Sequence, residues 1–537
     1  MPKMTEQELA KALVASGLLS PQQVQTAAQM RRPGHGLAQI IVDKGWVNQI
    51  DILQVDPEAL SGPTGTNPQA GAQIVDAIKR PEPQRELGVQ TSLDAVLDTN
   101  ANMPTHHVGI GQENTSLDSS AVRILGEAAR DRDDDDGTMG VIVAYCNEML
   151  RFAVESRASD MHLEPRETHL RPRYRIDGEL QSLGQDVPRE LQAPILSRYK
   201  LLANLDITET RMPQDGRFRA IIGGRQFDFR VSTLPSIYGE KMVMRLLDRT
   251  SLVTDLTRLG FAGETRDLFE EMLHRSYGMI LVTGPTGSGK TTTLYAALAA
   301  TRDETKNIVT VEDPVEYEMP GITQTSINTD IGLTFATQLR AILRQDPDVI
   351  LVGEIRDAET SDMAIRAALT GHLVLSTLHT NSAVAAVTRF QDMDVPSFLI
   401  ASSLSGVLAQ RLVRLLCRHC KREMPTDSPD YDLNIARLKL APGTTLYEGG
   451  GCEECNNTGY RGRLAVIELL NVNREIRQAI MDKADATTLQ RLAVKSGMKT
   501  LWQDAIEKVQ RGLTTGDEVA RVLLGTDEVE IETNIEA

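Results

Sequence analysis

Aromatic residues are scarce in this sequence of 537 residues: Phe, Trp and Tyr together make up 4% of it, although 41% is hydrophobic. The hydrophobic cores must therefore be built mainly from aliphatic side chains. Long apolar runs are also missing, and the first ten residues, MPKMTEQELA, lack the apolar centre of a secretory signal peptide. We therefore expect a cytoplasmic protein that reaches a membrane only through a partner.

An excess of positive charge is absent as well. The 57 Lys and Arg residues are outnumbered by 74 Asp and Glu residues, which gives a net charge of −17. Because a general nucleic-acid binder needs a basic footprint, this balance argues against that class, although it leaves room for a local basic patch. The length predicts three or four units rather than one domain.

The most informative stretch is 278–293, which reads GMILVTGPTGSGKTTT. Its apolar start predicts a buried parallel strand, and Leu294–Ala300 predicts a helix. The residues between them match G-x-x-x-x-G-K-[ST], the pattern of a phosphate-binding loop. We expect Lys290 to reach the β- and γ-phosphates of a bound nucleotide and the Thr291 hydroxyl to ligate Mg²⁺. The predicted nucleotide-binding residues of this loop are Gly284, Pro285, Thr286, Gly287, Ser288, Gly289, Lys290, Thr291 and Thr292.

Three further strands are predicted downstream, spaced as in an alternating α/β sheet. Ile308–Val311 is followed by EDPVE, Val349–Val352 is followed by GEIRD, and Leu373–Thr377 is followed by His379. Ligands of open α/β sheets bind beyond the carboxyl ends of the strands. We therefore expect these acids and histidines to converge on the phosphates held by Lys290.

Arginine is concentrated in two places. Residues 137–250, predicted as an α+β unit with a Gly-Gly hairpin, contain many arginines, which indicates either a surface that faces an anion or ordinary charged strand surfaces. Downstream, Arg340 and Arg344 lie four residues apart on a helix predicted for Thr334–Gln345, so they share one face. One alternative is that both arginines are solvated. The other is that they neutralise γ-phosphate charge, and the phosphate can then belong to a neighbouring subunit.

Cysteine is rare, and four of the five cysteines form two C-x-x-C pairs. Cys417 and Cys420 make the first pair, and Cys452 and Cys455 make the second about thirty residues later. Together the pairs predict a closed, tetrahedral zinc site with a structural role. A redox role fits less well, because thioredoxin-like surroundings are missing. Cys146 stands alone in an apolar helix and is expected to pack in a core.

The chain divides into five predicted segments. Residues 1–56 repeat a helical pattern, with Leu9–Val24 matching Leu37–Ile52, and predict a docking module. Residues 57–136 are rich in Pro, Gly and Gln, which predicts a loose linker with a helix near Ala121–Arg130 and an acidic hinge at Asp131–Asp136. The remaining segments are the α+β unit at 137–250, the nucleotide-binding core at 251–525 with a cysteine insert at 417–455, and a disordered acidic tail at 526–537.

Taken together, these motifs resemble the type II secretion and type IV pilus assembly ATPases, a branch of the secretion P-loop superfamily. The segment LRQDPDVILVGEIRD at 343–357 matches the family signature throughout, 310–316 resembles its aspartate box, and 370–381 resembles its histidine box. The resemblance covers roughly 140–525. It implies a RecA-like α/β P-loop core with a preceding α+β domain, a small zinc-binding insert and a helical N-terminal module.

The resemblance also implies roles for individual residues. Glu354 is expected to polarise the attacking water, and His379 to contact or sense the γ-phosphate side. Glu312, Glu316 and Asp313 are expected to support metal and water, with Asp313 joining Thr291 at Mg²⁺. The residues thereby assigned to catalysis are Glu354, Glu312, Glu316 and His379, and the arginines that fall at phosphate-facing or intersubunit positions are Arg230, Arg245, Arg340 and Arg344.

The implied protein is a homo-hexameric ATPase that uses ATP, Mg²⁺ and Zn²⁺ and lies peripheral to the inner membrane. Its implied partners are the cytoplasmic domain of an inner-membrane secretion partner and a membrane platform protein, so its membrane contact is indirect. The cysteine insert and the N-terminal module favour assembly of a pseudopilus or pilus over retraction. Chain length favours type II secretion, and type IV pilus assembly stays open.

Other functions fit the sequence less well. Related ring ATPases move DNA, but the acidic balance and the lack of aromatic-basic stripes oppose a nucleic-acid translocase. A non-catalytic scaffold is opposed by the presence of both Lys290 and Glu354. Some N-terminal modules of the family bind cyclic di-GMP through Arg-Leu-Gly, whereas this sequence reads Glu8-Leu9-Ala10 and Gly36-Leu37-Ala38. We therefore expect this module to dock to a membrane partner instead.

Overall fold

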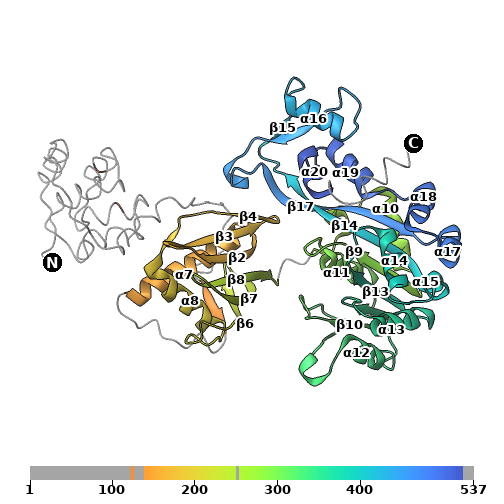
Figure 1. The fold of residues 1–537 in the computed structure, drawn as a ribbon, viewed down its shortest axis with the longest axis horizontal. Helices are drawn as coiled ribbons and strands as arrows, with labels where there is room; N and C mark the ends of the chain where they lie inside the picture. Colours follow the sequence, from red (N-terminus) through yellow and green to blue (C-terminus); the bar gives the residue numbers. More distant parts are fainter. Residues whose placement is uncertain (1–23, 25–40, 42–121, 126–137, 250–252, 524–537) are drawn as a thin grey trace, which may run out of the picture. The chain divides into compact units, whose positions relative to one another are not determined.

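The computed structural model describes Val24, Ile41 and residues 122–125, 138–249 and 253–523. The chain forms two compact units, Met1–Asp94 and Ala95–Ala537, and every element described below belongs to the second (Figure 1). Apart from Val24 and Ile41, the predicted N-terminal repeat lies outside the described residues, as do the acidic hinge, the acidic tail and nearly all of the linker. Within those residues, no helix has both the length and the hydrophobicity needed to cross a membrane.

The first part of the second unit is an antiparallel sheet of eight strands. Its strand order is β1-β6-β7-β8-β2-β3-β4, and β5 pairs with β3 (Figure 1). The strands are β1 (Arg123–Leu125), β2 (Ala158–Pro165), β3 (His169–Ile176), β4 (Glu179–Gln181), β5 (Val187–Pro188), β6 (Gln214–Ile222), β7 (Arg225–Ser236) and β8 (Gly239–Asp248).

One face of this sheet is covered by two helices, α7 (Thr138–Glu155) and α8 (Arg189–Leu202). Burial alternates residue by residue along β3, as expected for a strand with one face on a core. The core contains Cys146 from α7 and Tyr199 from α8, and the Tyr199 hydroxyl donates to the carbonyl of Cys146 at 2.9 Å. The other face is left to charged side chains, many of them arginines.

The helix predicted near Ala121–Arg130 is wrong at its centre, because Arg123–Leu125 form strand β1. This short strand pairs antiparallel with β6, and Ile124 lies opposite Ala220. The edge of a sheet presents unpaired backbone N–H and C=O groups, and β1 satisfies those of β6. Pairing with β6 outweighs the local preference of these residues for a helix. A strand of only three residues is also too short to show the alternating pattern by which strands are predicted from sequence.

The second part is a seven-stranded sheet with the order β11-β10-β12-β13-β9-β14-β17 (Figure 1). All neighbouring strands are parallel except β14 and β17. The strands are β9 (Gly278–Thr283), β10 (Ile308–Glu312), β11 (Thr323–Ser326), β12 (Val349–Val352), β13 (Leu373–Leu378), β14 (Leu404–Leu416) and β17 (Tyr460–Asn471).

Helices cover both faces of this sheet, so β9, β10, β12 and β13 are buried at every position. On one face lie α9 (Leu256–Leu259), α10 (Gly263–Leu273) and α11 (Lys290–Thr301). The other face is covered by α12 (Phe335–Ile342), α13 (Ala358–Leu369), α14 (Ala383–Asp392), α15 (Ser397–Ser403), α17 (Arg474–Met481) and α18 (Ala486–Lys495). Successive residues of β9 enter opposite cores, since Leu281 packs in one and Val282 in the other.

The cysteine-containing insert follows β14 and precedes β17. It contains β15 (Lys421–Glu423), α16 (Pro429–Arg437), β16 (Tyr447–Gly449) and a short 3₁₀ helix, η4 (Glu453–Cys455). A separate core joins the insert to α19 (Leu501–Gln510) and α20 (Gly516–Leu523). From about residue 460 onward the sequence predicts small helices around Arg474–Lys483, Thr488–Ser496 and Leu501–Gly512. The structure also contains β17 at 460–471 and α20, which that pattern does not predict.

Candidate functional site

The glycine-rich loop joins β9 to α11, as the sequence predicts. Gly284, Gly287 and Gly289 have φ values of +148°, +80° and +88°, which side chains rarely adopt. A Cβ atom at Gly284 would also lie only 2.4 Å from the carbonyl oxygen of Gln410. All three glycines are therefore required by backbone conformation, and Gly284 is required also by its close approach to β14.

Lys290 begins α11 and folds back over the loop. Its Nζ donates to the carbonyl oxygen of Gly284 at 2.9 Å and to that of Pro285 at 3.1 Å. Burial lowers the pKa of Lys290, the negative charge of Glu354 opposes this shift, and the positive charge of Arg411 adds to it. The cationic head thus lies at the loop and within electrostatic reach of Glu354, as phosphoryl transfer requires.

Glu354 lies just beyond the carboxyl end of β12, where it meets two basic side chains. Its Oε1 lies 2.5 Å from Arg356 Nη2, and its Oε2 lies 3.5 Å from His379 Nε2. The Glu354 side chain is 14% exposed and that of His379 is 51% exposed. The hydrogen bond from Arg356 to Glu354 raises the pKa of the Arg356 guanidinium. The structure therefore brings together Glu354 and His379 from the ends of neighbouring strands.

The histidine box is also hydrogen-bonded to β9, the strand that precedes the loop. Thr283, the last residue of β9, shares a hydroxyl–hydroxyl hydrogen bond of 2.7 Å with Thr380, and its Oγ1 accepts from the Thr380 N–H at 2.9 Å. Because Thr380 directly follows His379, these bonds fix the position of the histidine relative to the loop.

Glu312 occupies a different environment from the other acids of the aspartate box. It is 4% exposed, and its carboxylate accepts hydrogen bonds from Tyr295 Oη at 2.5 Å and Thr310 Oγ1 at 2.6 Å. The Tyr295 hydroxyl also accepts from the N–H of Glu316 at 3.3 Å. Glu312 is therefore enclosed in the core, where it links α11 to the aspartate box, whereas Asp313 is exposed.

The predicted arginines each have a partner of their own. Arg230 on β7 makes two hydrogen bonds to the Glu316 carboxylate, at 3.0 and 2.6 Å. Arg245 on β8 donates from Nε to Asp160 at 3.0 Å. Both arginines line a surface hollow of about 550 Å³ on the antiparallel sheet.

Arg340 and Arg344 are both exposed, and they lie in α12 and just after it. Arg340 Nη2 lies 2.6 Å from Glu359 Oε1 on α13, and Arg344 Nη1 donates to the carbonyl of Arg340 at 2.9 Å. Thr334 caps α12 at its N-terminus, since its Oγ1 accepts from the N–H of Thr337. These contacts leave both alternatives for the pair open, solvation or a role at a neighbouring subunit.

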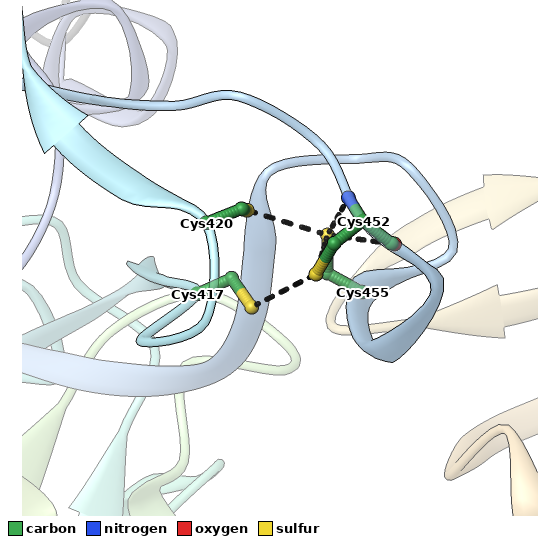
Figure 2. A group of neighbouring side chains, drawn as sticks. All are labelled: Cys417, Cys420, Cys452 and Cys455. Atoms are coloured by element: carbon green, nitrogen blue, oxygen red, sulfur yellow. Dashed lines mark hydrogen bonds between the residues drawn. The ribbon is translucent and has the colours of Figure 1, made fainter.

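The four cysteines of the two C-x-x-C pairs converge from either end of the insert (Figure 2). All their sulfur atoms lie within 4.8 Å of one another. The distances from Cys417 to Cys452 and from Cys420 to Cys455 are both 3.8 Å, and Cys452 to Cys455 is 3.7 Å. A tetrahedron with zinc–sulfur bonds of about 2.3 Å has edges of about 3.8 Å, so the cluster fits Zn²⁺.

Sequence reasoning missed three residues that shape this site. Arg356 lies inside the signature segment, but nothing in a linear pattern shows that it contacts Glu354. Tyr295 reads as one more apolar residue of α11, and Gln410 as one polar residue in the apolar run of β14. The contacts of Tyr295 and Gln410 span up to 122 residues of sequence, and only the folded sheet brings these partners together.

The fold and this arrangement define a P-loop nucleotide-binding protein with acids and a histidine at the carboxyl ends of parallel strands. A family model described as "Type II/IV secretion system protein" matches residues 135–521, and the chain belongs to this family. The comparisons confirm the resemblance inferred from the sequence and, within the described residues, the α/β class with a preceding antiparallel sheet and a tetracysteine insert.

Three similar proteins place the chain more closely. Type II secretion system protein E of Dickeya dadantii is 51% identical over 400 residues, covering 74% of this chain and 79% of that protein. The type IV pilus assembly ATPase PilB of Thermus thermophilus is 48% identical over 379 residues, covering 70% of this chain and 42% of that protein. The solved structure of the Legionella pneumophila ATPase DotB covers 72% of this chain and 97% of that chain, with a TM-score of 0.54 and 21% identity, a likeness of fold alone. The chain is an ATPase of this secretion family.

Proposed function

We propose that this chain is the motor of a type II secretion system, in which ATP hydrolysis drives pseudopilus assembly and protein export. One observation carries the proposal: Glu354 lies 3.5 Å from His379 and within electrostatic reach of Lys290, in a chain of the secretion family. A P-loop lysine and a water-polarising acid are the two elements that ATP hydrolysis needs from the protein.

Each residue of the site has a defined task in this proposal. Lys290 and the N–H groups of the loop hold the phosphates, and Glu354 orients the attacking water. Thr291 and Asp313, both exposed, carry the hydroxyl and carboxylate oxygens that Mg²⁺ prefers and are the residues that would hold it. When bound, Mg²⁺ supplies positive charge at the phosphate oxygens.

The aspartate box supports the site from two sides. Glu312 acts from inside the core, where its hydrogen bond with Tyr295 ties the loop that carries Asp313 to α11. Glu316 is engaged by Arg230, so the antiparallel sheet contacts the same segment. Arg230 and Arg245 are proposed to face phosphate when nucleotide is bound, with the exposed hollow between them as the approach.

Type II secretion is favoured over pilus assembly by the extent of the match. The chain spans 79% of the Dickeya secretion protein but 42% of the Thermus pilus ATPase. Pilus assembly is the alternative, because the identities are close. We further propose a homo-hexamer at the cytoplasmic side of the inner membrane, attached through the cytoplasmic domain of a secretion partner and acting on a platform protein.

Complementation of a strain that lacks the gene tests the proposal. The wild-type chain should restore export of secreted proteins, and Lys290→Ala should not, because the loop loses its phosphate-binding cation. Lys499→Ala is the matched control, since Lys499 is an exposed lysine paired with Glu507 far from the loop in sequence. Restored surface pili without restored export would favour the alternative, and ATP turnover that depends on DNA would point to a nucleic-acid translocase.

A further inference from the structure

Gln410 is a buried polar residue beside the phosphate-binding loop that the proposed chemistry does not use. It is 2% exposed and lies on β14, the neighbour of β9 in the sheet. Ala409 pairs with Thr283, the last residue of β9, so the next residue along β14 comes level with Gly284, where the loop begins. A carboxamide buried at this position needs partners for both its donor and its acceptor.

Both ends of the Gln410 carboxamide are bonded to the loop and the helix that follows it. Nε2 donates to the carbonyl oxygen of Ser288 at 2.7 Å, and Oε1 accepts from Thr293 Oγ1 at 2.8 Å. Both bonds are buried. One side chain, on a strand that is distant in sequence but adjacent in the sheet, therefore spans the junction between the loop and the first turn of α11.

The glycines of the loop are matched to the same residue. A Cβ atom at Gly284 would lie 2.4 Å from the Gln410 carbonyl oxygen, and one at Gly289 would lie 2.8 Å from Gln410 Nε2. Two glycines of the motif thus make room for Gln410, in addition to allowing the backbone to turn.

The bond to Ser288 also sets the direction of a backbone donor. In a trans peptide, the C=O of one residue and the N–H of the next point in opposite directions. Because the Ser288 carbonyl is drawn toward β14, the N–H of Gly289 points away from β14. Phosphate-binding loops work through N–H groups that are aimed in advance, and their preorganisation supplies affinity.

We propose that Gln410 is a positioning residue that holds the phosphate-binding loop in its nucleotide-binding shape by fixing the Ser288 peptide. This inference rests on the proposed function in one respect, that the ligand of the loop is ATP. In this proposal β14 preorganises the phosphate-binding loop, although it contains no residue of the phosphate-binding motif.

Steady-state ATPase kinetics of the full chain test this role. Gln410→Met keeps the length and burial of the side chain but removes both hydrogen bonds. We expect its KM for ATP to rise roughly tenfold, as for the loss of one or two buried hydrogen bonds, while kcat at saturating ATP changes less than twofold. Thr293→Val removes only the bond to Oε1 and should raise KM less, because Ser288 keeps its partner.

Gln192→Met is the matched control. Gln192 is a buried glutamine that also donates to a backbone carbonyl, that of Tyr238 at 3.1 Å, but it lies on α8 in the antiparallel-sheet part. This variant should lose thermal stability without a rise in KM. If Gln410→Met loses stability with an unchanged KM, the side chain has only a packing role and the inference is overturned.

The outcomes separate this inference from the proposed function. A wild-type chain that neither binds nor hydrolyses ATP contradicts the proposed function, whatever the variants do. A wild-type chain that hydrolyses ATP while Gln410→Met matches its KM contradicts only the role of Gln410. If Gln410→Met does not fold, Thr293→Val decides: a raised KM at unchanged kcat supports the inference, and wild-type kinetics overturn it.

Discussion

Glu354 lies between two basic side chains, Arg356 and His379, and within electrostatic reach of a third, Lys290. A carboxylate at this place can accept a hydrogen bond from water while its charge interacts with the neighbouring cations. The same surroundings explain why its charge, more than its size, should matter for hydrolysis.

Glu354→Gln tests this point because it keeps the shape of the side chain and removes the charge. We expect ATP binding to persist and turnover to fall at least about hundredfold, the usual scale for loss of a general base or water-orienting group. Steady-state turnover and binding of a fluorescent ATP analogue measure the two effects. Asp362→Asn, which breaks only an exposed pair with Arg366 on α13, is the control and should leave turnover unchanged. Normal hydrolysis by Glu354→Gln would remove the proposed role.

At the residue scale, the sequence predicted the convergence of Glu354 and His379 because the carboxyl ends of parallel strands meet at one edge of a sheet. The environment of Glu312 was not predictable in the same way. Its neighbour Asp313 is exposed, while Glu312 completes β10 and turns into the core toward Tyr295. Which of two adjacent acids faces solvent depends on the side of the strand to which each points and on hydrogen-bond partners elsewhere in the chain.

At the scale of elements, the strands that were predicted are those whose pattern is complete within a few residues. Val349–Val352 was predicted at its observed bounds, as a continuous apolar run. β14 and β17 were not predicted, because the strands with which they pair are far away in the sequence. β14 pairs with β9 and with β17, and the whole insert separates β14 from β17. β1 was not predicted as a strand because three residues carry no period.

Strand β2 allows a prediction about acid stability. Glu164 contacts Arg173 at 2.7 Å, Arg166 at 2.8 Å and Lys241 at 3.0 Å. Burial raises the pKa of Glu164, but the hydrogen bonds from Arg173 and Lys241 outweigh it and lower the pKa to about 2. Since the folded pKa lies below the ordinary value of 4.5, Glu164 stabilises the fold above that pH and loses this effect as the pH falls toward about 2.

Glu164→Gln should therefore be less stable than the wild type at pH 7, and the difference should shrink between pH 4.5 and 2. Urea unfolding at a series of pH values measures it. Glu167→Gln, an exposed acid in the turn that follows β2, is the control and should track the wild type. A difference that stays constant with pH would show that Glu164 contributes packing rather than charge.

The insert allows a prediction about metal content. Cys417→Ser removes one of the four converging sulfur atoms, so we expect bound zinc to fall and protease cleavage between residues 417 and 455 to increase. ATP affinity should persist, because the loop belongs to β9 and α11. Cys146→Ser is the control: burial raises the pKa of Cys146 to about 12, which keeps it a neutral core thiol outside the cluster. Unchanged zinc in Cys417→Ser would contradict the four-thiolate site.

At the scale of the whole molecule, the open question is where Arg344 acts. Its guanidinium is exposed, and its hydrogen bond goes to the backbone of Arg340 rather than to an acid. In a ring of identical subunits, a cation on one subunit can neutralise phosphate charge in the site of the next. Such a residue would matter for turnover and not for nucleotide binding by a single chain.

Arg344→Ala should therefore bind ATP normally as a monomer. As an oligomer, its ATP turnover should be at least about tenfold lower than that of the wild type, because a cation supplied to the neighbouring site is missing. Mixing gives the sharper measurement. Lys290→Ala subunits cannot hold phosphate but keep Arg344, whereas Arg344→Ala subunits keep the loop, so mixed rings should regain activity that neither variant has alone. Arg366→Ala, an exposed arginine on α13, is the control and should be fully active by itself. If mixing does not restore ATP turnover although both variants still assemble with wild-type subunits, Arg344 does not act across the subunit boundary. Arg340 and Arg344 are then solvated surface residues.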